Sequence, residues 1–101
     1  MLAQFESLVR IGQGVEFWLA RELQDLLGYT EWRNFATVVQ RARDACANSG
    51  HDPDDHFVAV NKMVDLGSGA RRRIEDVALT RYAAYLIAQN GDPKKEAIAF
   101  A

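Results

Sequence analysis

A glycine-rich hairpin signal near the middle of the chain, within residues 60–92, constrains the fold more than any other feature. Two β-prone runs, residues 62–66 and 72–77, flank a tip at residues 67–70 that reads GSGA. Glycine accepts the positive φ angles that tight hairpin turns require, so this pattern predicts a β-hairpin. Three consecutive arginines follow the tip and are expected to place adjacent guanidinium groups near the hairpin end: Arg71, Arg72 and Arg73.

A helix is expected to follow this hairpin. Thr80 is a good N-cap residue, and the apolar spacing after it is typical of a helix that lies on a sheet. Gly91 is a natural stop, so we expect the helix to end at about Asn90. A hairpin with a cationic tip, backed by an apolar helix, indicates contact with an anionic partner.

A second hairpin is predicted near the start of the chain. Residues 12–14 read GQG, which is a turn signal, and residues 15–19 alternate as a strand does. Residues 4–10 fit either a strand or one turn of helix. Phe17 and Trp18 in the second arm are expected to be core aromatics.

A pair of helices is predicted between the two hairpins. The first covers residues 20–27 and stops at Gly28, and the second covers residues 31–48 with Thr30 as its N-cap. A short helix, a glycine turn and a longer helix outline a helix-turn-helix, although any αα-hairpin gives the same pattern. Both alternatives stay open: a purely structural pair, or a second helix that faces a DNA groove with the polar residues Arg33, Asn34 and Arg41.

Taken together, these signals predict an α+β fold in one small domain over residues 1–101, with about two β-hairpins and about four helices. The fourth helix is expected from Lys94 onward, with Asp92 as its cap and Pro93 in its first turn. Its apolar pattern is still running at Ala101, which predicts that the chain is the N-terminal fragment of a longer protein.

Composition limits the classes of function. The formal net charge is −2 and the isoelectric point is about 5.6, which argues against a protein that coats nucleic acid non-specifically. Nine of the twelve cationic residues are arginine, which suits a local patch that binds phosphates or base edges. A single cysteine, Cys46, and no signal-peptide or membrane-span pattern predict a cytoplasmic protein without membrane contact.

No catalytic constellation is visible, so we predict that the chain is not an enzyme and needs no cofactor. Ser68 lies in a hairpin turn, not in a strand-to-helix elbow, and no phosphate-cradle motif is present. One loop contains five residues that suit metals, but they crowd a short stretch without a spaced partner pair, so a polar linker explains them better. These loop residues are His51, Asp52, Asp54, Asp55 and His56.

Three long strings carry a resemblance to a known family: GYTEWRNF at 28–35, ACANSGHDPDDHFVAVNKMVDLGSGARR at 45–72 and LTRYAAYLIAQNGDP at 79–93. They resemble the DNA-damage-inducible protein D family of the bacterial SOS response. A more distant resemblance is to the Bro-N domain of phage antirepressors and baculovirus repeated-ORF proteins, echoed by residues 17–29 and 79–100. The chain departs from this pattern at Leu19, where relatives often have a residue that caps the following helix.

This resemblance implies a Bro-N-like DNA-binding regulatory module that is induced by DNA damage and that modulates recombinase filaments on DNA. The alternative is a module that binds a repair or recombination protein, or associates with itself, without touching DNA. The net charge favours this alternative, whereas the clustered arginines favour DNA. The predicted contact residues for DNA are Arg33, Asn34, Arg41, Arg71, Arg72 and Arg73.

Overall fold

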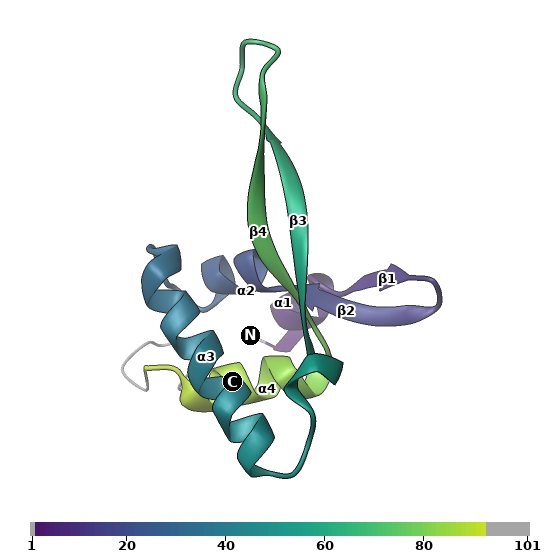
Figure 1. Cartoon of the computed structure of the whole chain (residues 1–101), viewed down its shortest axis with the longest axis vertical. Coiled ribbons are helices and arrows are strands. Elements are labelled where there is room, and N and C mark those ends of the chain that lie inside the picture. Colours follow the sequence, from purple (N-terminus) through teal and green to yellow (C-terminus); the bar gives the residue numbers. More distant parts are fainter. Residues whose placement is uncertain (1, 93–101) are drawn as a thin grey trace.

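Four antiparallel strands and four α-helices make up residues 2–92, the part of the chain that the computed structural model describes (Figure 1). The predicted α+β class is confirmed. The helices are α1 (Leu2–Ser7), α2 (Ala20–Leu26), α3 (Trp32–Asn48) and α4 (Arg81–Asn90), with a short 3-10 helix η1 at Pro53–Asp55. The strands are β1 (Arg10–Gly12), β2 (Val15–Leu19), β3 (Phe57–Asp65) and β4 (Arg71–Leu79).

The strands form one sheet in the order β1-β2-β4-β3. Both predicted hairpins are present, as β1–β2 and as β3–β4. Strands β3 and β4 have nine residues each, longer than the runs that the sequence indicated, because the pairing continues from the tip down to Phe57 opposite Leu79. For residues 4–10 the sequence allowed either a strand or a helical turn. The structure has the end of helix α1 there, followed by the start of the short strand β1.

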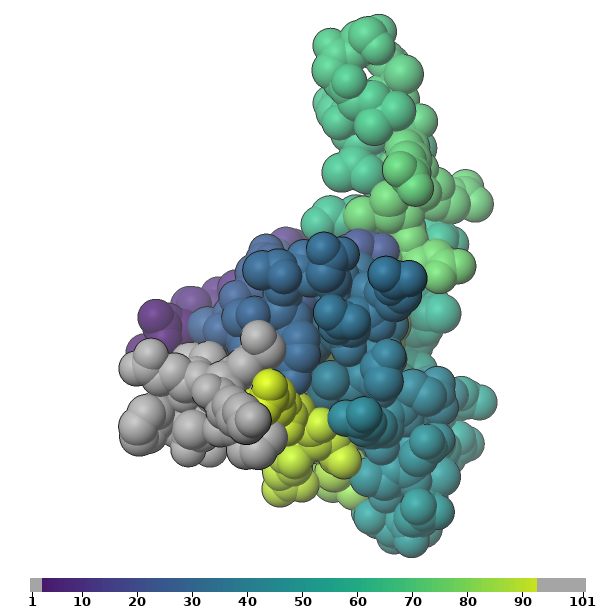
Figure 2. Space-filling view, turned by 90° about the vertical axis from the view of Figure 1, so that its left-hand side faces the viewer, coloured from purple at the N-terminus to yellow at the C-terminus, as the bar shows by residue number. Residues whose placement is uncertain are grey.

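The β3–β4 hairpin projects from the body of the molecule (Figure 1). Strand β2 pairs with β4 only at Ala78 and Leu79, so within residues 2–92 neither edge of the hairpin has a strand partner beyond that point. At about 3.3 Å per residue, the seven residues from Arg71 to Val77 extend about 23 Å. The space-filling view shows the hairpin standing above a rounded body formed by the helices (Figure 2).

The core lies between the base of the sheet and helices α2, α3 and α4. Trp18 is fully buried, as predicted, and its ring Nε1–H donates to the Phe5 carbonyl at 2.9 Å while the two rings stack. Phe17 is only half-buried, since it sits on the opposite face of β2. Helices α3 and α4 pack against each other, and the largest buried side chains besides Trp18 are Phe35, Leu23, Leu79 and Ile87.

The helix ends agree with the sequence in one case and disagree in another. Thr80 caps α4, because its hydroxyl accepts a hydrogen bond from the Ala83 N–H at 3.1 Å. The prediction for Thr30 is wrong: Glu31 occupies the N-cap of α3 and no side chain caps that helix. The helix predicted from Lys94 onward lies outside the described residues. No helix within residues 2–92 has the length and apolar character needed to cross a membrane.

Candidate nucleic-acid interface

The three arginines of the hairpin do not share one face. Arg71 lies opposite Asp65 and Arg73 lies opposite Met63, so Arg71 and Arg73 lie on the same face of the ribbon. Arg72 projects to the other face because successive strand residues alternate. All three side chains are exposed. The hairpin end therefore presents guanidinium groups on both of its faces.

Lys62 is a fourth cation of the hairpin that the sequence reasoning did not select. It is exposed and lies opposite Ile74, on the same face of the ribbon as Arg72. Lys62 could be assigned to this face only with the pairing register of β3 and β4, which the sequence alone did not supply. Two carboxylates accompany the four cations between residues 57 and 75: Asp65 and Glu75.

Helix α3 carries the other three predicted contact residues on its solvent side. Arg33 and Asn34 are exposed in its first turn, and Arg41 is exposed about two turns further along. The opposite side of α3 is apolar and buried against the core. In Figures 1 and 2 the first turns of α3 lie at the end of the body from which the hairpin projects, and the helix then runs away from it.

Arg21 connects the start of α3 with the hairpin. Its guanidinium lies 4.1 Å from the centre of the Trp32 ring, and its Nε–H donates to the Glu75 carbonyl at 2.6 Å. The first turn of α3 is therefore held beside the middle of β4. Arg33 and Asn34 therefore belong to a turn that lies beside the body end of the hairpin, Arg71 to Arg73 lie further out along β4, and Arg41 lies about two turns further along α3.

A carboxylate from the hairpin caps the neighbouring helix α2. Leu19 occupies the N-cap position but offers no side-chain hydrogen bond, as its sequence departure suggested. Instead, Asp76 of β4 accepts hydrogen bonds from the backbone N–H groups of Arg21 at 3.0 Å and Val77 at 2.8 Å. Asp76 thus fixes the orientation of the hairpin relative to α2. Sequence gave no signal for this contact, because Asp76 and Arg21 are 55 residues apart.

The remaining arginines of the body are paired with carboxylates. Arg10 binds Glu22 at 2.7 Å on the β1–α2 side. Arg43 binds Asp54 at 3.0 Å, which ties α3 to η1. These two ion pairs neutralise cations that would otherwise add to a surface patch.

Arg81 is the centre of a third ionic cluster. It donates to Glu6 and to Glu16, so it joins the start of α4 to α1 and β2. The hydrogen bond from Arg81 lowers the pKa of Glu6, and the same pair raises the pKa of Arg81. The guanidinium also lies over the Trp18 ring, 4.9 Å from its centre. This cluster holds the body together and is not available to a ligand.

The predicted contact arginines differ from these paired ones. Within residues 2–92, no carboxylate lies within ion-pair distance of their guanidinium groups, and none of them donates a hydrogen bond to another side chain or carbonyl. They therefore keep their donors for solvent or for a ligand. The arginines in this group are Arg33, Arg41, Arg71, Arg72 and Arg73.

The histidine-containing loop is occupied by internal contacts. Asp52 accepts from the Asp54 N–H at 3.0 Å, the Asx turn expected of a polar linker. The Nδ1 atom of His56 lies 2.8 Å from the Thr80 hydroxyl, and the His51 ring lies 5.0 Å from the Tyr82 ring at a tilted angle. No three metal-binding side chains come together among the described residues.

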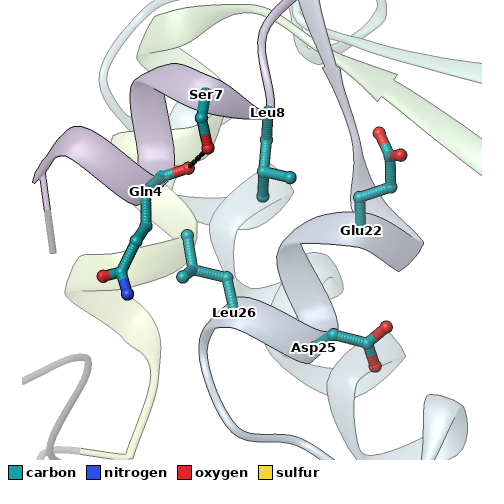
Figure 3. Close-up of a pocket in the computed structure, with 6 residues that line it drawn as sticks. All are labelled: Gln4, Ser7, Leu8, Glu22, Asp25 and Leu26. Atoms are coloured by element: carbon teal, nitrogen blue, oxygen red, sulfur yellow. Dashed lines mark hydrogen bonds between the residues drawn. The ribbon is translucent and has the colours of Figure 1, made fainter.

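A shallow hollow of about 450 Å³ lies between α1 and α2 (Figure 3). Leu8 and Leu26 line it from the two facing helices, and the Ser7 hydroxyl donates to the Gln4 carbonyl at 2.7 Å. Its carboxylate rim disfavours an anionic ligand. The residues of this rim are Glu22 and Asp25.

Cys46 is buried on the inner side of α3. Burial raises the pKa of its thiol, which keeps the thiol protonated and unreactive at neutral pH.

Comparison with known proteins gives two matches. The profile of the BRO family, N-terminal domain, matches residues 7–101. DNA damage-inducible protein D of Escherichia coli (strain K12) is 52% identical over 96 residues, which cover 94% of this chain and 35% of that protein. The chain therefore spans about a third of the length of this relative. No solved structure matches the chain.

Proposed function

The chain belongs to the BRO family, whose N-terminal domain it carries, and from this premise we propose that it is a regulatory module of the bacterial DNA-damage response that acts by binding DNA. Its similarity to DNA damage-inducible protein D supports the link to DNA damage. We propose a role in binding, without catalysis, in the cytoplasm. Modulation of recombinase filaments is the proposed consequence, through competition for the same DNA.

The distribution of paired and unpaired arginines carries this proposal. The arginines inside the body are neutralised by carboxylates or held by carbonyl groups, as described for Arg10, Arg43 and Arg81. The five predicted contact arginines are exposed and have no such partners among the described residues. A chain with a net charge of −2 that keeps three adjacent arginines unpaired at the end of one hairpin offers a local anion-binding surface.

The shape of the hairpin also supports binding to duplex DNA. Two-stranded β-ribbons enter either groove of B-DNA, and both grooves are about 7.5 to 8.5 Å deep. The four residues from Arg71 to Ile74, which lie beyond the contact of Arg21 with Glu75, extend about 13 Å, so the hairpin end reaches the floor of a groove before the body meets the DNA backbone. Arg33 and Asn34 at the start of α3 are then placed to contact phosphates beside the groove that the hairpin enters.

The test is a fluorescence-anisotropy titration of a short labelled duplex and a single strand of the same sequence, at two salt concentrations. The variant Arg71→Ala/Arg72→Ala/Arg73→Ala is expected to bind with a weaker salt dependence. The plot of the log of the binding constant against log salt should become less steep by about 3, since each phosphate contact contributes about 0.9 to the steepness. At about 50 mM salt this corresponds to an affinity loss of about a thousandfold. The loss of affinity can be attributed to the lost charges, because the three replaced side chains are exposed and lie outside the core.

Arg10→Ala is the matched control for the single variant Arg72→Ala. Both remove one guanidinium from a strand, but Arg10 belongs to the small β1–β2 hairpin on the other side of the sheet (Figure 1). We expect Arg72→Ala to weaken binding and Arg10→Ala to leave it within about twofold. Absence of binding to both DNA forms at about 50 mM salt, or equal effects of the two variants, would overturn the proposal.

A second candidate function is binding to a repair protein or to another copy of this chain. It is favoured by two apolar side chains at the end of the β1–β2 hairpin: Ile11 is 69% exposed and Val15 is 62% exposed. Sedimentation of the wild type and of an Ile11→Ser/Val15→Ser variant separates the two ideas. Loss of self-association in this variant, together with an absence of DNA binding by the wild type, would favour the second candidate.

A further inference from the structure

Two large apolar side chains are exposed at the end of the β3–β4 hairpin. Leu66 is 57% exposed and Met63 is 47% exposed. Neither of them takes part in the core of the domain. Exposed leucine alone is common on protein surfaces, but here both side chains lie beside three unpaired arginines on a projecting element.

The hairpin tip is narrow, and Leu66 is the large side chain that comes immediately before its closing loop. The Leu66 N–H donates to the Ala70 carbonyl at 2.9 Å, which closes the loop. Gly67 and Gly69 have positive φ angles, and added Cβ atoms there would meet no neighbour. The loop between Leu66 and Ala70 therefore carries only the small side chain of Ser68. Leu66 is therefore the large side chain nearest to the tip of the narrow β3–β4 hairpin.

The arginines are arranged around this apolar end. Met63 lies directly opposite Arg73, and Arg71 lies on the same face two pairs nearer to the tip. Leu66 follows immediately after β3 and continues the register opposite Ala70, so alternation puts it on the other face, the face of Arg72. The end of the β3–β4 hairpin therefore combines the apolar Leu66 with three arginines that pair with the residues one to three positions before it.

An apolar wedge flanked by cations matches the way in which proteins kink duplex DNA. Such proteins place arginine in the minor groove and insert a leucine, methionine or similar side chain between two base pairs, which unstacks the step. Binding of single strands uses aromatic side chains on which bases stack. Residues 58–78 contain no aromatic residue, so the hairpin end suits a base step of a duplex better than a single strand.

We propose that the hairpin end enters the minor groove of duplex DNA and inserts Leu66 between two adjacent base pairs, so that the duplex is kinked. This inference rests on the proposed DNA binding and adds how the DNA is held. Arg71 and Arg73 contact the walls of the groove, and Arg72 with Lys62 contacts the phosphates on the other side. Pyrimidine–purine steps are the preferred sites, because they unstack most easily.

The test uses a duplex rich in TA steps, with a donor and an acceptor dye at its ends and 2-aminopurine at a central step. The wild type is expected to raise energy transfer, through bending, and to raise 2-aminopurine fluorescence, through unstacking. Leu66→Ser is expected to lose both signals and to bind about tenfold more weakly, while the salt dependence of its affinity stays that of the wild type. Ile11→Ser, which changes an exposed apolar residue at the other hairpin, is the matched control and retains both signals.

The outcomes separate this inference from the proposed function. Binding of the wild type without bending, or equal bending by Leu66→Ser, would overturn the wedge and leave DNA binding intact. A change in sedimentation of Leu66→Ser with unbent DNA would identify the apolar end as a protein contact and would also overturn the wedge. No binding of the wild type to the duplex would remove the proposed function itself. Circular dichroism of Leu66→Ser checks the fold, which an exposed loop residue should not disturb.

Discussion

Replacing Asp76 with alanine is expected to destabilise the protein, because the carboxylate of this strand residue caps helix α2 from outside the helix. Asp76 is 1% exposed, and its Oδ1 accepts two backbone hydrogen bonds, from Arg21 and Val77. Alanine leaves the Arg21 N–H at the start of α2 without its acceptor. The change also removes the contact that fixes the hairpin against the body.

The magnitude follows from two opposing effects. A hydrogen bond to a charged group contributes about 1.5 to 3 kcal/mol, and two such bonds are lost. Against this, burying a carboxylate is costly, and Oδ2 of Asp76 finds no hydrogen-bond partner among the described residues. We therefore expect a net loss of about 2 kcal/mol, the upper end of the range for removal of an N-cap. Asp76→Asn keeps an acceptor oxygen and is expected to cost about 1 kcal/mol.

Urea unfolding followed by tryptophan fluorescence measures these differences, since Trp18 is buried in the core. With a slope of about 1 to 3 kcal/mol per molar urea, Asp76→Ala should lower the midpoint by about 1 M. Glu75→Ala is the matched control, because Glu75 is the adjacent carboxylate of β4 and points to the exposed face, where a change within about 0.5 kcal/mol is expected. Equal midpoints for Asp76→Ala and Glu75→Ala would refute the capping argument.

Three further predictions concern the body of the domain. Thr80→Val, which keeps the size but removes the hydroxyl that accepts from Ala83, should cost about 1 kcal/mol in urea unfolding, and Thr80→Ser should cost less. Arg81 lowers the pKa of Glu6, so their pair stabilises the fold fully above the ordinary value of 4.5 and loses this contribution as the pH falls below it. The Tm of Arg81→Ala should accordingly be lower than that of the wild type at pH 7, and the gap should narrow below pH 4.5; a constant gap would contradict the assignment. Cys46 should react with a maleimide only as fast as the protein opens, and rapid labelling in native buffer would show that the thiol is accessible.

Much of the secondary structure could be predicted because its signals are local. Glycines mark the turns of both hairpins, and Gln13 and Gly14 adopt the positive φ angles of a two-residue turn. Thr80 is next to the helix that it caps, so its role was visible in the sequence. The same reasoning failed for Thr30, because α3 begins one residue later than the cap signal indicated and its first turn is held by Arg21 from another helix.

The candidate site could be predicted only as a set of residue types. Clustered arginines after a glycine tip indicated a cationic hairpin end, and the hairpin has that end. Only the pairing register showed how the cations are divided between the two faces of the ribbon. It puts Lys62 on the face of Arg72, opposite to the face of Arg71 and Arg73. Whether α3 faces the same DNA as the hairpin remains a prediction for the binding experiments.

The sequence by itself determined where the hairpins and helices form, because turn conformation, helix periodicity and most capping depend on residues within a few positions of each other. Only the tertiary structure decided which charges are neutralised. Arg81 meets Glu6 across 75 residues of chain, and Asp76 reaches Arg21 across 55. Such pairings depend on how distant segments pack around the core, and they leave the arginines of the projecting hairpin, which no other segment of the described chain covers, as cations free to meet an anionic partner.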